Sequence, residues 1–186
     1  ALRVSVSFTD GEGTLEKVYS AATGAVGNTI TGTNAANTLT GTAGGDVITG
    51  LQGNDTINAG DGDDEIVWNA NNALFGNVTD GSDFVNGGAG IDTIDVNTRN
   101  GVNEIYRIYT RIEAGTAGIA ITNANTEIVI TRNGTNFGSA VALLDNIEEI
   151  KINTLLTSAN NGNGVVDSSV QNGAVQGDTI VVEGDF

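Results

Sequence analysis

Side chains that carry oxygen ligands recur at a fixed interval in the first half of the chain. Each is an asparagine or aspartate followed two residues later by an aliphatic residue, and the set comprises Asn28, Asn37, Asp46, Asp55, Asp64, Asp83 and Asp92. The spacing is nine residues throughout, except for nineteen residues between Asp64 and Asp83. Carboxylate and amide oxygens are hard ligands, so a regular array of them indicates binding of a hard divalent cation.

Glycines stand at two fixed offsets before these residues. Those five residues before an aspartate are Gly41, Gly50 and Gly87, and those two residues before one are Gly44, Gly53, Gly62, Gly81 and Gly90. A six-residue turn that reverses the chain needs residues at positive φ, which glycine adopts at little steric cost. The three residues after each turn then form a short strand, whose middle aliphatic residue points inward.

Two nine-residue units make one coil of eighteen residues, with a turn on each flank. Successive coils stack in parallel, and their aliphatic residues form a narrow core that no single unit could build. We therefore predict an all-β fold, a parallel β-roll or β-solenoid built from nonapeptide units. The coil places Asp46 and Asp64 on one flank, one layer apart, and Asn37 and Asp55 on the other flank.

The nineteen-residue interval fits one coil plus one inserted residue. Residues 71–75 would then fill a degenerate half-coil. On this interpretation Asp83 follows Asp64 on the first flank, and Asp92 continues the second flank, so that each flank carries a column of carboxylates.

Aligned carboxylates repel one another unless a cation lies between them. Two like charges about 5 Å apart cost roughly 1–3 kcal/mol at dielectrics between bulk water and a protein surface. Calcium fits the gap, because it binds about six to eight oxygens at about 2.3–2.6 Å, which turn carbonyls and one aspartate from each layer can supply. Magnesium fits poorly, since it needs a tighter octahedron and releases water reluctantly.

We therefore predict that the chain binds several Ca²⁺ ions. The candidate ligands are carboxylates, one side-chain amide and the turn glycines. They are Asp46, Asp55, Asp64, Asp83, Asp92, Asn37, Gly41, Gly44, Gly50, Gly53, Gly62, Gly81, Gly87 and Gly90.

The composition excludes several other functions. The chain of 186 residues carries 23 Asp and Glu against 7 Lys and Arg, a formal charge of −16, which repels nucleic acid and anionic membrane surfaces. Histidine and cysteine are absent, which rules out the usual zinc sites, Ser-His-Asp and Cys-His nucleophiles, and a haem with a proximal histidine. No apolar run reaches the roughly 18 residues that span a bilayer. Methionine is absent too, so we expect a segment of a longer polypeptide.

The nine-residue units resemble the RTX, or haemolysin-type, calcium-binding repeat, Gly-Gly-x-Gly-x-Asp-x-aliphatic-x. Residues 87–95 match it in full, and residues 41–49 and 50–58 match it with one or two substitutions. In the first unit of the run, Asn37 replaces the aspartate. Less regular units are found at residues 32–40, 59–67 and 78–86. The resemblance implies a right-handed parallel β-roll, folding driven by calcium and, often, export by type I secretion.

We expect three parts along the chain. Residues 1–22 form an N-terminal β-hairpin, residues 23–95 form the calcium-binding roll, and residues 96–186 form a β-rich continuation or cap that covers an edge of the roll. In the hairpin, Val4 and Phe8 alternate with polar residues ahead of a turn. It resembles the last hairpin of Ig-like or cadherin-like modules in large bacterial surface proteins, and it fits a cap of the roll equally well.

The third part loses the glycine period. Its expected elements are strands at residues 104–110, 126–132 and 149–152, a short helix at residues 111–118, and a loop at residues 160–164. Asn133 and Gly134 form a turn signal, and residues 177–180 look like one more degenerate unit.

The expected function is that of a calcium-binding structural module in a large exported bacterial protein. The module would fold on binding Ca²⁺ outside the cell, as part of a secreted or surface-attached parent polypeptide. Residues 105–114 and 126–136 resemble segments near RTX repeats in large exported proteins, some of which carry a haem peroxidase domain. The resemblance implies that the parent is an adhesin or includes such an extracellular enzyme.

Catalysis is the first alternative. Paired acids could act as in a glycosidase, and the candidates are Glu148 with Glu149, or Asp61 and Asp63 with Asp64. Adjacent acids on a strand point to opposite faces, and acids in turns are expected to be ligands, so we predict no enzyme activity.

A calcium-stabilised solenoid that binds a surface or a glycan is the second alternative. Residues 31–33 and 40–42 both read Thr-Gly-Thr and could stack into a regular threonine row, which breaks at Leu51. The target of such a row would be a cell surface or a glycan.

Overall fold

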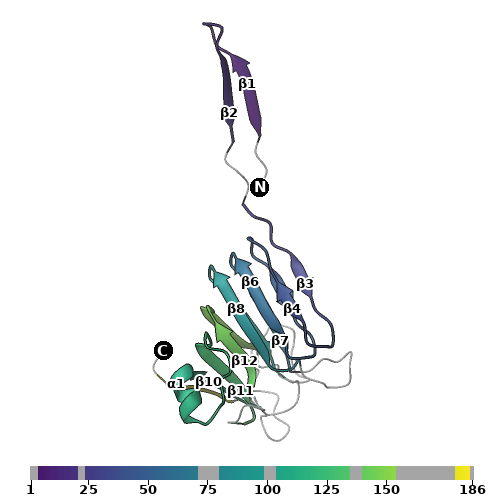
Figure 1. Cartoon of the computed structure of the whole chain (residues 1–186), viewed down its shortest axis with the longest axis vertical. Helices are drawn as coiled ribbons and strands as arrows, with labels where there is room; N and C mark the ends of the chain where they lie inside the picture. Colours follow the sequence, from purple (N-terminus) through teal and green to yellow (C-terminus); the bar gives the residue numbers. More distant parts are fainter. Residues whose placement is uncertain are drawn as a thin grey trace, which may run out of the picture.

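The computed structural model of the chain describes residues 4–20, 24–70, 80–98, 104–134, 140–153 and 179–184. Within these residues nearly all regular structure is β-strand (Figure 1). A five-stranded sheet contains β3 (Thr29–Thr31), β5 (Val47–Thr49), β7 (Glu65–Asn69), β9 (Thr93–Asn97) and β13 (Glu149–Asn153). A seven-stranded sheet contains, in spatial order, β4 (Thr38–Thr40), β6 (Thr56–Asp61), β8 (Asp83–Ala89), β12 (Ala140–Asp145), β11 (Ile128–Arg132), β10 (Ile105–Thr110) and β14 (Thr179–Glu183).

The glycine-rich part of the chain is a parallel roll with the expected coil length. Val47 in β5 pairs with Thr29 in β3 and with Glu65 in β7, each eighteen residues away. In the other sheet, Thr38 pairs in parallel with Thr56, again eighteen residues on. The prediction of a parallel β-roll with two strands per coil is therefore confirmed.

The inward aliphatic residues stack from layer to layer and form the core between the sheets. In the five-stranded sheet the register aligns Ile30, Ile48, Ile66, Ile94 and Ile150. In the seven-stranded sheet it aligns Leu39, Ile57, Val85 and Leu144. Residues of both columns belong to one buried cluster, so each layer depends on its neighbours for burial.

The layer that contains the long sequence interval is wider than the others. Glu65 in β7 pairs with Thr93 in β9, which is 28 residues away instead of eighteen. β7 extends to Asn69, and this extension adds Trp68 and Ala70 to the core, both at most 1% exposed. The Trp68 indole Nε1 donates to the carbonyl of Gly81, 3.1 Å away.

The prediction for this interval is wrong. Asp83 begins β8 beside β6 and so follows Asp55, whereas Asp92 precedes β9 beside β7 and follows Asp64. The interval holds half a coil plus ten residues, the difference between 28 and 18, rather than a full coil plus one. Longer strands and the buried Trp68 need more chain per layer, which residue spacing alone does not reveal. The degenerate half-coil proposed at residues 71–75 lies outside the described residues.

The strands after the glycine repeats continue both sheets: β12 and β13 lie directly against the last repeat, and β11 and β10, although earlier in the chain, lie beyond β12. β12 pairs in parallel with β8, and β13 pairs in parallel with β9. β11 and β10 follow with antiparallel pairing, and β14 pairs in parallel with β10. All six residues of β12 are buried. Residues 160–164 and 177–178 lie outside the described residues, and the boundaries of the three predicted parts stay a prediction.

One short helix, α1 (Arg111–Thr116), packs against this extension. The Thr110 side chain caps it by accepting from the Glu113 backbone N–H, and Gly118 at φ 79° follows its end. Ala114 and Ile119 form a second buried cluster with side chains of β10, β11 and β12.

The N-terminal strands β1 (Ser5–Thr9) and β2 (Leu15–Tyr19) form an antiparallel hairpin. Its turn is closed by Asp10, whose Oδ1 accepts from the Thr14 backbone N–H at 2.8 Å, and by Gly13 at φ 84°. In Figure 1 the hairpin stands apart from the two sheets, and its apolar side chains are 45–73% exposed. Its strands therefore contribute nothing to the core of the roll.

Replacing Ile48 with alanine tests the stacked core. Ile48 is fully buried, so we expect the free energy of unfolding to fall by about 2–5 kcal/mol. Urea denaturation in saturating calcium measures it. The control is Val47→Ala, because Val47 is the neighbouring residue and is 37% exposed; we expect a change of about 0.5 kcal/mol or less there. Equal losses in the two variants would contradict the assigned core.

Candidate metal centre

The register gathers the oxygen-bearing side chains into two columns, one on each flank of the roll. We name them ladder A, which contains Asp46, Asp64 and Asp92, and ladder B, which contains Asn37, Asp55 and Asp83. All five aspartates are buried, with at most 4% of each residue exposed. Burying charged carboxylates in this way is costly unless each is paired.

Each ladder is connected by hydrogen bonds that cross from layer to layer. Asp64 Oδ1 accepts from the backbone N–H of Asp46 at 2.6 Å, and Asp92 Oδ1 accepts from that of Asp64 at 2.9 Å. In ladder B, Asp83 Oδ1 accepts from the backbone N–H of Asp55 at 2.9 Å. One oxygen of each carboxylate is therefore committed to holding neighbouring turns in register.

In three of the five ladder aspartates, the second carboxylate oxygen has no such partner among the described residues. Oδ2 of Asp55, Asp64 and Asp92 is buried and makes no hydrogen bond with any described residue. Asp46 differs, because its Oδ2 accepts from the backbone N–H of Thr42. Buried carboxylate oxygens without a donor are expected where a cation binds.

Glycine is needed in the turns for two separate reasons. At the fourth position of a unit it supplies left-handed backbone, as at Gly53 with φ 124°, although Gly44 does not have positive φ. At the first position it leaves space, since a Cβ on Gly41 would meet both Asp46 Oδ2 and the carbonyl oxygen of Ala59 in the next layer. A carboxylate oxygen and a carbonyl oxygen from different layers therefore converge beside the first glycine.

The electrostatics of the ladders disfavour bare carboxylates. Burial raises the pKa of Asp83 to about 8, and the charges of Asp55 and Asp80 contribute to the rise. Burial also raises the pKa of Asp64 and of Asp92, and in each case neighbouring carboxylates add to the effect. The aspartates of successive layers are therefore close enough to repel one another.

Asp46 is the exception in this respect. Burial alone would raise its pKa, but hydrogen bonds from the backbone of Asn28 and from the backbone and side chain of Thr42 outweigh burial, and its pKa is lowered. Both of its carboxylate oxygens accept hydrogen bonds, Oδ1 from the Asn28 backbone and Oδ2 from the Thr42 backbone.

Within the described residues, no basic side chain forms an ion pair with a ladder carboxylate. Among the described residues the ion pairs are Arg132 with Glu104 and Lys151 with Glu149, and neither involves a ladder aspartate. No group of three or more acidic, histidine or cysteine side chains clusters as a ready metal site in the described part of the chain. A cation here must therefore take many of its oxygens from turn carbonyls. Calcium accepts such a mixed set.

Asp80 is a candidate ligand that the sequence analysis missed. It is 1% exposed, its Oδ2 accepts from the backbone N–H of Asn69 at 2.7 Å, and its Oδ1 is buried without a partner. Burial raises its pKa to about 6, and the charge of Asp55 adds to the rise. The signal was its position three residues before Asp83, inside an otherwise degenerate turn.

Four of the five acids considered for catalysis have structural partners. Asp63 Oδ1 accepts from the backbone N–H of Ile91 at 2.9 Å, and Asp61 is exposed. Glu148 accepts from the Asp92 backbone, whereas Glu149 accepts from the Thr93 hydroxyl at 3.1 Å. The two adjacent glutamates thus serve different neighbours.

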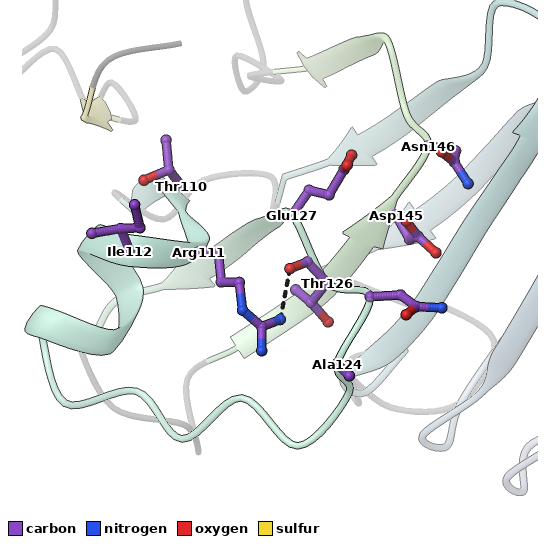
Figure 2. Close-up of a pocket in the computed structure, with 9 residues that line it drawn as sticks. Thr110, Arg111, Ile112, Ala124, Thr126, Glu127, Asp145 and Asn146 are labelled. Atoms are coloured by element: carbon purple, nitrogen blue, oxygen red, sulfur yellow. Dashed lines mark hydrogen bonds between the residues drawn. The ribbon is translucent and has the colours of Figure 1, made fainter.

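A shallow pocket lies elsewhere, between the start of α1, residues 124–127 and the end of β12 (Figure 2). Its basic residue, Arg111, points one guanidinium nitrogen at the carbonyl oxygens of Thr126 and Asn123, at 2.9 and 3.0 Å. The guanidinium therefore holds the loop in place. Asp145 and Asn146 border the pocket at the end of β12.

Comparison with known proteins agrees with the geometry of the ladders. Residues 31–66 and 78–97 match the family model of the RTX calcium-binding nonapeptide repeat (4 copies). No curated protein and no solved structure matches the chain. RTX repeats bind Ca²⁺ ions, so the resemblance seen in the sequence is confirmed for these residues, and calcium is the cation that the roll takes.

The raised pKa values predict how stability depends on pH without calcium. The pKa of Asp83 is about 8 in the folded chain and 3.8 for an ordinary aspartate, so the folded chain binds this proton more tightly than the unfolded chain does. This contribution to stability is complete below the ordinary value and is lost as pH rises through the folded value. In calcium-free buffer we therefore expect the urea midpoint to decrease as the pH is raised from about 5 to about 8.5.

Saturating calcium is the control for this measurement. Calcium competes with protons for the same oxygens, so its presence should weaken or reverse the dependence on pH. A midpoint in calcium-free buffer that rises over this range would show that the ladder carboxylates are not protonated in the folded chain.

Proposed function

We propose that this chain is a calcium-dependent structural module of a large exported bacterial protein, poorly folded at low cytosolic calcium and folded outside the cell. The observation that carries the proposal is the set of buried ladder carboxylates whose second oxygens have no donor and no basic partner among the described residues. Extracellular calcium modules bind with dissociation constants of about 10⁻⁴–10⁻³ M, which matches calcium levels outside cells.

Binding and folding are coupled because the ligands of one site are distant in sequence. Asp46 and Asp64 are eighteen residues apart, and Asp64 and Asp92 are 28 residues apart. An unfolded chain has no assembled site, so the free energy of ion binding becomes free energy of folding.

The ligand set that we propose consists of the predicted residues. The aspartates of both ladders supply carboxylate oxygens, Asn37 supplies an amide oxygen, and the turn glycines supply carbonyl oxygens. Asp80 adds a carboxylate beside Asp55 and Asp83. Because Asn37 is uncharged, the interval between it and Asp55 should bind calcium most weakly.

The net charge of the chain also supports calcium binding. The chain carries a formal charge of −16, and four bound Ca²⁺ ions would bring it to roughly −8, which removes much of the self-repulsion. Calcium therefore acts as the missing counterion of an acidic chain that has few basic residues.

Within a parent polypeptide, the module would serve as a rigid extracellular segment. We propose that the parent is secreted or attached to the bacterial surface, as an adhesin or as a protein that includes an extracellular enzyme, with no catalysis in this module. No helix in the described part of the chain has the length and apolar character needed to cross a membrane.

A glycan- or surface-binding threonine row finds little support. Thr31 pairs with Thr49, which pairs with Val67 in the next layer, and Thr40 pairs with Asn58, which pairs with Asn86. The outward positions thus change chemistry after one or two layers.

Removing calcium tests the proposal directly. A chelator should lower the β-sheet content and the thermal stability of the chain, and added calcium should restore both, because the ladders repel without a cation. Far-ultraviolet circular dichroism before and after dialysis measures it. Identical spectra and melting temperatures in the two states would sink the proposal.

Replacing Asp64 with asparagine tests the ladder. Asn37 shows that an asparagine fits a ladder position, so Asp64→Asn should keep the fold in saturating calcium while raising the calcium midpoint of folding about tenfold. The matched control is Glu65→Gln, which removes the same charge one residue later, on the outward face of β7. Equal midpoints in the two variants would mean that net charge, not ligation, sets the affinity.

A further inference from the structure

The turn between β12 and β13, residues 146–148, lacks the glycine repeat and lies against the last repeat as one more layer. Glu149 in β13 pairs with Thr93 in β9, and its backbone N–H donates to the carbonyl of Asp92 at 2.9 Å. One layer earlier, the N–H of Thr93 donates to the carbonyl of Asp64 at 2.8 Å. Glu148 therefore occupies the ladder position that follows Asp92.

The Glu148 side chain makes the hydrogen bond of a ladder aspartate. Its Oε2 accepts from the backbone N–H of Asp92 at 2.8 Å. Asp92 Oδ1 accepts from the backbone N–H of Asp64 in the same manner, at 2.9 Å. Glu148 is thus a fourth carboxylate of ladder A.

This turn is shorter than a repeat, which hides it in the sequence. From Val85 to Ile94 the inward residues are nine apart, whereas from Leu144 to Ile150, their partners in the next layer, they are six apart. Asn146 takes the left-handed conformation, at φ 49°. Glutamate is one methylene longer than aspartate, which lets it reach the ladder from a turn that is three residues shorter.

Oxygens converge here as they do in the regular layers. A Cβ on Gly87 would meet the carbonyl oxygen of Asn146 and Asp92 Oδ2, the same pair of groups found beside Gly41. Asp92 is fully buried, and its Oδ2 has no partner among the described residues. Figure 2 shows Asn146 at the end of β12, on the turn that provides this carbonyl.

We propose that Asp92, the Asn146 carbonyl and Glu148 form a terminal Ca²⁺ site that closes ladder A beyond the repeats. The inference rests on the proposed function, because it needs the ladders to bind calcium. It adds one ion to those held between repeat turns. Since its ligands come from both the last repeat and the chain after it, this ion fastens β12 and β13 onto the roll. The Glu148 side chain is exposed, so the ion enters from solvent.

Glu148→Gln separates ligation from a purely structural role. Glutamine keeps an oxygen that can accept from the Asp92 backbone but loses the charge that a cation needs. The matched control is Glu149→Gln, which removes an equal charge from the neighbouring residue. Glu149 points elsewhere, toward Thr93 and Lys151.

The experiment counts calcium bound to the full chain at defined free calcium, by equilibrium dialysis and atomic emission. Circular dichroism at saturating calcium checks that each variant is folded. We expect Glu148→Gln to bind one ion fewer than the wild type, or to bind one of its ions at least tenfold less tightly. Glu149→Gln should match the wild type.

The outcomes are distinguishable. If the wild-type chain binds no calcium, the proposed function fails and the terminal site fails with it. If the wild type binds calcium and Glu148→Gln binds the same number of ions with the same affinities, Glu148 only caps a backbone N–H, and the terminal site alone is overturned.

Discussion

The stability of the roll depends on how its buried negative charge is neutralised. Its aspartates are nearly inaccessible, they lie above one another, and no arginine or lysine among the described residues pairs with them. The chain after the repeats solves the same problem differently: the buried carboxylate of Glu104 accepts from Arg132 at 2.8 Å and from the Tyr106 hydroxyl at 2.9 Å. One part of the molecule carries its own cation, and the other part has to take its cation from the surroundings. The stability of the two parts should therefore respond differently to the medium.

Alignment of the aspartates follows from two features of the backbone. Stacked aliphatic residues fix the register of each strand, because a shift by one residue would turn the inward side chains outward. Turn glycines allow the layers to approach until carbonyls of one layer meet carboxylates of the next, as at Gly41. The metal sites are therefore a product of strand register, and no turn contains a complete site by itself.

Much of this could be predicted from the sequence, because a nine-residue period constrains both strand spacing and turn chemistry. The coil length, the inward aliphatic residues and the pairing of Asp46 with Asp64 all follow from it. The placement of Asp83 and Asp92 does not follow from it, because an insertion can either widen one coil or add another. In this chain the coil is wider, and Trp68 is buried in it. Asp80 was hidden in a degenerate turn. Glu148 was hidden because its turn is shortened and has glutamate in place of aspartate, so no periodic pattern marks it.

The two ends of the stack are unequal. In β3 and β4 the middle residue is half-buried and both of its neighbours are exposed, whereas every residue of β12 is buried. Within the seven-stranded sheet, protection thus increases from the open end at β4 toward the covered end near β12, whereas β13, at the edge of the five-stranded sheet, is as exposed as β3. In a one-dimensional assembly of this kind, order should start at the protected end and spread outward. The covered end would act as a seed, and the coil at the open end would be the first to fray when the ions leave.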